Sequence, residues 1–337
     1  MKAVAYYQSL PSSDPHSLQD IELPAPTPGP RDLLVAVRAI SVNPVDTKIR
    51  RNVAPSEGQA KVLGWDVAGV VQAVGSEVSL FQVGDEVYYA GALQRQGGNS
   101  ELHVVDERIV GHKPKRLGFA EAAALPLTAI TAWELLFERL KIAEGSASSG
   151  QSLLIIGAAG GVGSILTQLA RQLTGLTVIG TASRPETADW VRQLGAHHVL
   201  DHSQPLLPQL QQLGIQQVDH VASLTHTDLH YEQLIEALAP QGQLALIDDP
   251  AQLDVVKLKR KSLSLHWEFM YTRSLFETPD MQAQHALLER VAQLIDAGTL
   301  RTTLGEHFGS INASNLRRAH TLLESGKARG KIVLEGF

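Results

Sequence analysis

The sequence predicts an α/β protein with two domains, a compact, partly open β-barrel and a doubly wound parallel sheet. Three observations support this prediction. The chain has 337 residues, enough for two domains of ordinary size. Short β-branched runs broken by glycine turns fill its first part, and strands alternate with amphipathic helices in its middle. We expect residues 1–123 and 271–337 to form the barrel domain and residues 124–270 the sheet domain.

The predicted barrel strands come first in the chain. Leu33, Val35 and Val37 alternate with other residues in the run RDLLVAVRAISV, which is typical of a half-buried strand. Residues 70–91 contain short β-branched runs separated by Gly-Ser and Gly-Asp turns, as in antiparallel strands. The segment from Asn43 onward is also expected to be extended.

The middle of the chain predicts six strands with helices between them. A buried strand, SLLII, leads into a glycine-rich turn and a helix with Leu166, Leu169 and Leu173 on one face. Further strands are expected at 177–180, 197–201, 218–223, 243–248 and 262–269, and further helices at 185–194, 206–213 and 229–240. This alternation is the pattern of a doubly wound parallel sheet.

After about residue 270 the alternation stops. Two helices are expected at 282–298 and 314–326, with Ser314 as the amino-terminal cap of the second. The last segment, GKIVLEGF, predicts a strand whose partners must come from the amino-terminal domain. The chain would therefore leave the first domain, build the second and return.

Composition excludes several classes of function. The net charge is −6 and no run of basic residues occurs, so we expect no nucleic-acid partner. No apolar stretch suggests a membrane span, and the start MKAVAYYQSL lacks the apolar core of a signal peptide. The chain has no cysteine, which removes disulfides, thiol catalysis and thiolate-bound metals. A cytoplasmic enzyme is the expectation.

The glycine turn is the strongest local motif. Gly157, Gly160 and Gly163 follow the strand SLLII and open a helix, and Gly161 and Val162 lie between them. Glycine lets the backbone turn sharply and approach a pyrophosphate, which the free N–H groups of the helix start can bind. A structural turn with tight helix–strand packing is the alternative; the alternating strands and helices around the motif favour dinucleotide binding.

The end of the second strand predicts which dinucleotide binds. NAD-binding proteins usually carry Asp or Glu there, but this strand is followed by Ser183 and Arg184 and no acid. A guanidinium and a hydroxyl can bind a 2′-phosphate that a carboxylate would repel. NADPH is therefore the predicted cofactor, and the alternative is that Arg184 is a solvated surface charge.

Together these motifs resemble the medium-chain dehydrogenase/reductase superfamily. GAAGGVGS, SVNPVDTKIR, GWDVAGVV, LPLTAITAWELL and the ending SGKARGKIVLEGF are similar to its quinone oxidoreductase branch, in particular the zinc-type alcohol dehydrogenase-like proteins. The resemblance covers essentially the whole chain. It implies a catalytic GroES-like barrel, a Rossmann domain, and a homodimer formed through the edge strand at Ser262–Phe269.

The resemblance also implies where a catalytic zinc would lie, and the expected ligands are missing. Asn43 occupies the position of the first Cys ligand, and Trp65 and Asp66 replace the His-Glu pair. Zinc needs about three N, O or S protein ligands. His103 and His112 match no ligand position of the family. We expect no metal.

Site residues are implied by the resemblance too. Asn43 would face the nicotinamide, Trp65 would form an apolar wall, and Asp66 would brace the loop. Thr128 matches a position that contacts the nicotinamide or its ribose, with helix packing as the alternative. Lys48 is a candidate donor or a surface lysine.

Asp46 has two further interpretations, since it either braces the loop or pairs with Arg50.

Three functions remain open. The leading hypothesis is a zinc-independent NADPH-dependent reductase that transfers hydride to quinones or α,β-unsaturated carbonyls, because such acceptors leave an oxyanion that needs only hydrogen-bond donors. The alternative in the same class is an alcohol or aldehyde dehydrogenase of the zinc type. The alternative of another class is an NADPH-binding redox sensor or interaction protein with little turnover.

Overall fold

The computed structural model describes residues 1–337 and divides the chain into two compact units. The first unit comprises Met1–Ile130 and Tyr271–Phe337, and the second comprises Thr131–Met270. The helix at Phe119–Ala123 packs against strands of the first unit.

The first unit is built on two open sheets. The smaller has the strand order β2-β1-β4; the larger has the order β15-β16-β3-β5-β6-β8, with β7 also paired to β3. The strands are β1 (Lys2–Tyr6), β2 (Gln19–Glu22), β3 (Asp32–Val42), β4 (Lys61–Val62), β5 (Val67–Val74), β6 (Glu86–Tyr89), β7 (Leu102–Asp106), β8 (Val110–His112), β15 (Leu304–His307) and β16 (Lys331–Glu335). The helices are α1 (Pro44–Asn52), η1 (Glu107–Ile109), α2 (Phe119–Ala123), α8 (Thr272–Phe276), α9 (Ala283–Asp296) and α10 (Ala313–Glu324), and α3 (Pro126–Trp133) runs on into the second unit.

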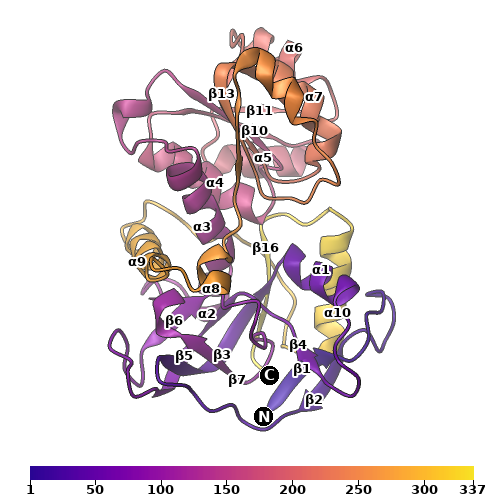
Figure 1. Ribbon diagram of the computed structural model, residues 1–337, viewed down its shortest axis with the longest axis vertical. Helices are drawn as coiled ribbons and strands as arrows, with labels where there is room; N and C mark the ends of the chain where they lie inside the picture. Colours follow the sequence, from indigo (N-terminus) through magenta and orange to yellow (C-terminus); the bar gives the residue numbers. More distant parts are fainter. The chain divides into compact units, whose positions relative to one another are not determined.

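The two ends of the chain meet in this unit. The last strand, β16, pairs antiparallel with β3 through Ile332 and Val42, as the sequence predicted for the carboxyl terminus. It also pairs in parallel with β15, a strand that the sequence analysis missed. The termini are drawn close together in Figure 1, and Lys2 and Phe337 line one groove.

The segment after Asn43 is a helix, so the extended segment expected there is wrong. Pro44 occupies the first helical position of α1, where its fixed φ suits the helix and its missing N–H is no loss. The backbone N–H of Asn43 donates to the Asp46 carboxylate at 2.7 Å, which closes the first turn. The side chains of Pro44–Asn52 therefore follow the helical period and do not alternate between two faces as they would in a strand.

The cap of α10 also differs from the prediction. The side chain of Asn312, not Ser314, accepts the N–H of Asn315 at 2.8 Å. Asn is an equally good cap, and it lies two residues before the expected one, so the helix begins at Ala313.

The second unit is one six-stranded parallel sheet in the order β11-β10-β9-β12-β13-β14. Its strands are β9 (Ser152–Ile156), β10 (Thr177–Thr181), β11 (His198–Leu200), β12 (Val218–Ser223), β13 (Leu238–Leu246) and β14 (Ser264–Trp267). Its helices are η2 (Glu134–Arg139), η3 (Ser146–Ser148), α4 (Gly161–Leu173), α5 (Pro185–Gln193), α6 (Leu206–Gln212), α7 (Thr227–Ala237) and η4 (Val255–Lys261). All six predicted strands are present, and the order reverses beside β9, as in a Rossmann fold.

The core of the second unit explains its strand sequences. Leu154 and Ile156 of β9 pack with Leu206 and Leu210 of α6 and with Leu234 of α7. Figure 1 shows α6 and α7 side by side. Because β9 has neighbours on both sides and is buried throughout, it is apolar at nearly every position instead of alternating.

One helical stretch, Phe119–Arg139, is long and apolar enough to cross a membrane by length and composition, which the sequence analysis did not expect. In the structure 78% of its most apolar window is buried inside the protein. A buried core helix passes the same test, so this stretch is weak support for a membrane span.

Candidate active site

Asn43, Asp66 and Lys331 form a buried polar network in the first unit. The Asp66 carboxylate accepts from the Asn43 amide at 2.8 Å, from the Lys331 ammonium at 2.9 Å and from the Leu127 backbone N–H at 2.7 Å. All three polar side chains are at most 3% exposed. The network joins the loop before β5, the cap of α1 and the last strand β16.

Lys331 uses its whole hydrogen-bonding capacity inside this network. Its Nζ donates to the Val42 carbonyl at 3.0 Å, to the Asn43 side-chain oxygen and to Asp66. An ammonium has three protons, so three acceptors satisfy it. Lys331 therefore holds Asn43 and Asp66 in place.

Asp46 lies beside the network as a second buried carboxyl. It accepts from the backbone N–H of Asn43 at 2.7 Å and from that of Gly64 at 2.9 Å, so it braces the loop as one interpretation predicted. Burial raises its pKa to about 7, an effect that these hydrogen bonds and Lys331 oppose and that Asp66 reinforces. Burial also raises the pKa of Asp66, against the effects of Lys331 and Asn43.

Arg50 does not pair with Asp46, which corrects the other interpretation. It is fully buried and forms an ion pair with Glu324 of α10.

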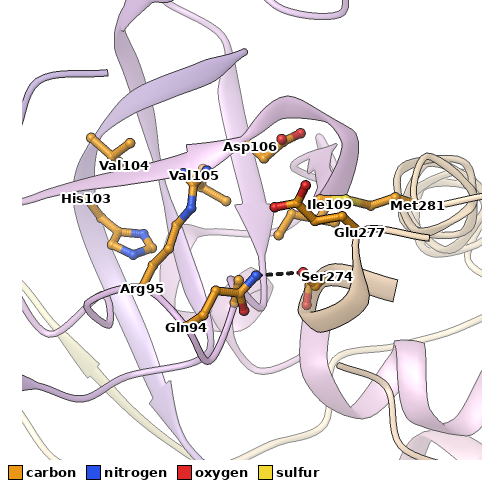
Figure 2. Close-up of a pocket in the computed structure, with 11 residues that line it drawn as sticks. Gln94, Arg95, His103, Val104, Val105, Asp106, Ile109, Ser274, Glu277 and Met281 are labelled. Carbon is orange, nitrogen blue, oxygen red and sulfur yellow. Dashed lines mark hydrogen bonds between the residues drawn. The ribbon is translucent and has the colours of Figure 1, made fainter. Parts of the chain in front are cut away.

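Trp65 is 1% exposed, and its indole N–H donates to the Ala92 carbonyl at 3.3 Å. Ala92 also lines a cavity of about 20 Å³ shown in Figure 2, where Gln94 donates to the Ser274 carbonyl at 2.6 Å. A cavity of this size holds about one water molecule and no substrate. Trp65 is thus a packed element of the first unit.

The remaining predicted residues of the first unit are Lys48 and Thr128. Lys48 is exposed on α1. Thr128 is buried in α3, and its hydroxyl donates to the Leu125 carbonyl at 3.1 Å, which is a helix-packing role. Contacts of either residue with a cofactor or substrate stay predictions.

The donors at the expected metal position do not fit a zinc ion. Asn43 and Trp65 are not zinc ligands, and an ammonium and two N–H donors already occupy the Asp66 carboxylate. No group of three or more His, Asp or Glu side chains in the chain is arranged to hold a metal.

His103 and His112, the two histidines weighed above as metal ligands, have other partners. His103 contacts the Tyr89 hydroxyl and the Gln96 carbonyl, both at 3.0 Å, and His112 contacts Glu289 at 2.8 Å.

Sequence analysis missed two residues of this site. Lys331 appears in the sequence analysis only as part of the carboxyl-terminal motif. A lysine at the start of an otherwise apolar strand, KIVLE, is the signal that could have identified it. Tyr271 is buried, and burial together with Asp46 and Asp66 raises its pKa well above the usual value. Its phenol therefore keeps its proton, and no local pattern in the sequence marks it.

In the second unit the glycine turn has the conformation that the motif requires. Gly157 has φ of +78°, which favours glycine. A Cβ on Gly163 would lie 2.4 Å from the Gly157 carbonyl oxygen and 2.6 Å from the Ala158 Cα, so only glycine allows this close approach. A Cβ on Gly160 would meet the same oxygen at 3.4 Å, which is ordinary contact.

This turn fits a pyrophosphate. Helix α4 begins at Gly161 with Gly160 as its cap, and no side chain caps it. The N–H groups of Gly161, Val162 and Gly163 therefore lack intrahelical acceptors, and they point where the dipole favours an anion.

The end of β10 carries no carboxylate. Ser183 is exposed, and Arg184 caps α5 with its Nε 3.3 Å from Glu186. The guanidinium is 37% exposed, so it is accessible to a ligand and to solvent alike.

Two family models match the chain. The alcohol dehydrogenase GroES-like domain matches residues 29–133, and the zinc-binding dehydrogenase domain matches residues 194–334. The chain belongs to the medium-chain dehydrogenase/reductase family, within its quinone oxidoreductase and zinc-type alcohol dehydrogenase-like branch.

Two relatives define the similarity in sequence. A zinc-type alcohol dehydrogenase-like protein of Staphylococcus aureus is 40% identical over 336 residues, 99% of each chain. A quinone oxidoreductase of Pseudomonas aeruginosa is 34% identical over 314 residues, covering 91% of this chain and 92% of its own.

Two solved structures define the similarity in fold. A Rhizobium etli protein, provisionally described as a zinc-dependent alcohol dehydrogenase, is 55% identical with a TM-score of 0.96, covering 100% of this chain and 98% of its own. A mycobacterial protein solved with NADPH is 28% identical with a TM-score of 0.83, covering 99% of this chain and 100% of its own.

Proposed function

We propose that this oxidoreductase is a zinc-independent, NADPH-dependent reductase of quinones or α,β-unsaturated carbonyls. One observation carries the proposal: at the metal position of the family, the Asp66 carboxylate is bound to Lys331 and Asn43 in a buried network. A metal would have to displace a buried ammonium and would then find no second suitable ligand among Asn43 and Trp65. The Pseudomonas aeruginosa relative is a quinone oxidoreductase, which supports the reaction class.

The chemistry suits such a site. Bound NADPH supplies the hydride, and a quinone or an enone accepts it without Lewis-acid activation. The residues of this chain then need only to bind, orient and donate hydrogen bonds. In this proposal the glycine turn binds the pyrophosphate, Asn43 and Asp66 are positioning residues held by Lys331, and the buried Trp65 packs beside them.

NADPH is proposed over NADH because no acid follows β10. Ser183 and the accessible guanidinium of Arg184 can take the 2′-phosphate. The mycobacterial neighbour solved with NADPH supports the same cofactor. Thr128 keeps its proposed contact with the nicotinamide half.

We also propose a cytoplasmic homodimer that pairs through β14. This strand lies at the edge of the parallel sheet, and Trp267 at its end is 51% exposed. An uncovered apolar edge strand is a pairing hazard, and a second copy would cover it.

One specific observation favours a second function. The Rhizobium etli protein, 55% identical to this chain, is provisionally described as a zinc-dependent alcohol dehydrogenase. If this chain shares that property, it would oxidise alcohols with NADP⁺ and bind zinc through rearranged ligands.

Purified protein should be assayed for NADPH oxidation against quinones, enones and aldehydes, and for NADP⁺ reduction by alcohols. We expect turnover with a quinone or an enone and tighter binding of NADPH than of NADH. Turnover confined to alcohols would establish the dehydrogenase instead. Cofactor binding with no turnover on any acceptor would indicate a redox sensor.

A further inference from the structure

Three histidines gather at the carboxyl edge of the parallel sheet in the second unit. His202 follows β11, His226 caps α7 and His230 lies in the first turns of α7. The rings of His202 and His230 are 6.0 Å apart, edge to face, and His226 interacts electrostatically with both. We call these three residues the histidine cluster.

The cluster touches the strand that selects the dinucleotide. Nδ1 of His202 lies 3.3 Å from the hydroxyl oxygen of Thr181, the last residue of β10. The same hydroxyl accepts the backbone N–H of Gly157 at 3.1 Å, so Thr181 links His202 to the glycine turn. Ser183, where the fold places recognition of the ribose 2′ position, is only two residues further on.

His202 and His230 are neutral imidazoles before a ligand binds. Thr181 can donate its hydroxyl proton to Nδ1 of His202 while its oxygen accepts from Gly157, and a hydroxyl oxygen can also accept a second hydrogen bond, so this contact suits either tautomer of the ring. Burial lowers the pKa of both His202 and His230, so both rings are neutral near pH 7 when no anion is bound. Nδ1 of His230 is buried and has no hydrogen-bond partner, which leaves one ring position of the cluster unused.

Two of the three carboxylates near the cluster, Asp201 and Asp248, accept hydrogen bonds from neighbouring residues. Asp201 accepts from the N–H and hydroxyl of Ser203 at 2.9 and 2.7 Å. Asp248 accepts from the N–H of Thr227 at 2.8 Å and from its hydroxyl. These two carboxylates and Asp228 are the charged groups that act on His202 and His230 besides the other histidines. The cluster can therefore gain a proton if a stronger anion arrives.

We propose that the histidine cluster binds the 2′-phosphate of the dinucleotide and that His202 takes up a proton from solvent when the phosphate binds. The inference rests on the proposed NADPH dependence and adds its regulation: preference for NADPH over NADH increases as pH falls. The chemistry is that of a phosphate monoester, which carries up to two negative charges and raises the pKa of a nearby imidazole. Arg184 supplies the pH-independent part of the binding, and the cluster supplies the pH-dependent part.

The test is calorimetric titration of NADPH and NADH at pH 6, 7 and 8 in two buffers of different ionisation enthalpy. For the wild type we expect NADPH binding to be accompanied by uptake of at most one proton by the protein. NADPH should bind roughly tenfold more tightly at pH 6 than at pH 8. NADH binding should show neither effect. His202→Gln should abolish the proton uptake and the pH dependence of NADPH binding. His226→Asn, which suits the left-handed backbone there at φ of +50°, should weaken both effects in part.

His198→Gln, on β11 but outside the cluster, is the matched control and should behave as the wild type. Adenosine 2′,5′-bisphosphate should reproduce the proton uptake, and inorganic phosphate alone should not. Preferential NADPH binding with no proton uptake, unaltered in His202→Gln, would overturn this inference and leave the proposed reductase intact. Proton uptake with inorganic phosphate but not with NADPH would assign the cluster to free phosphate and also overturn it. Absence of any NADPH preference at pH 6 would instead count against the proposed cofactor.

Discussion

The glycine turn of the second unit and the Asn43–Asp66–Lys331 network of the first unit differ in how their members are distributed along the chain. The turn lies within residues 157–163 and depends on backbone conformation. The network joins Lys331 to Asn43 across 288 positions and depends on side-chain pairing. A local backbone requirement leaves a pattern in the sequence, whereas a long-range polar pairing leaves almost none.

The largest expected effect concerns the network. Lys331→Met should lower the free energy of unfolding by about 3–5 kcal/mol, because it leaves the Asp66 carboxylate buried and unpaired. Chemical denaturation measures this change. Lys115→Met, at an exposed lysine of the same unit, is the control and should stay within about 0.5 kcal/mol of the wild type. If the Lys331 variant is as stable as the control, the network does not stabilise the loop before β5.

The corresponding change in the glycine turn should be smaller. Gly163→Ala places a Cβ 2.4 Å from the Gly157 carbonyl oxygen, whereas Gly160→Ala brings it only to 3.4 Å. We expect the first substitution to lower the free energy of unfolding by about 1–3 kcal/mol through overpacking. Thermal unfolding of the two variants side by side measures the difference. Equal stability of both would refute the assignment of close helix–strand packing to Gly163.

A third prediction uses a buried histidine of the first unit. Burial and the nearby Arg50 lower the pKa of His320 to about 3, against a usual value of 6.5. Between these two pKa values His320 is protonated in the unfolded chain but neutral in the folded chain. The free energy of unfolding therefore falls as pH decreases from 6.5 towards 3. The contribution is about 2 kcal/mol between pH 7 and pH 5.

The measurement is the difference between wild type and His320→Gln across that range, because Asp46 acts in the opposite sense. Its pKa is raised to about 7, so its contribution to stability is lost as pH rises. The difference between the two proteins isolates His320 and should shrink as pH falls. A difference that does not vary with pH would show that His320 titrates normally.

The smallest effect is expected at Lys48. This lysine is exposed on α1, so Lys48→Ala should change the free energy of unfolding by less than about 0.5 kcal/mol. We also expect kcat/KM for a quinone to be nearly unchanged. A loss of about a hundredfold or more at unchanged stability would restore Lys48 as a proton donor.

The parallel sheet could be predicted from the sequence because each of its elements has its own local signal. Apolar strands such as Leu153–Ile156, the helix after Gly160 and the return of the last strand to the first unit all follow from periodicity and turn residues. The helix at Pro44–Asn52 was missed because its signals, Pro44 and the Asn43–Asp46 cap, were set aside for an extended reading.

The site was only partly predictable. Asn43, Trp65 and Asp66 were identified from the resemblance. No pattern in the sequence indicates that the Asp66 carboxylate binds the Lys331 ammonium. Lys331 and Tyr271 reach the network only through tertiary folding, and so do the three members of the histidine cluster. Their sequence neighbours give no sign of what their side chains contact.

Zinc content and turnover measured on one sample test the central claim most directly. The protein should be purified without added metal, analysed for zinc, and assayed for NADPH–quinone or NADPH–enone turnover before and after dialysis against a chelator. We predict zinc well below one equivalent and turnover that the chelator does not change. Stoichiometric zinc, with turnover lost on chelation and restored by adding zinc, would contradict the account.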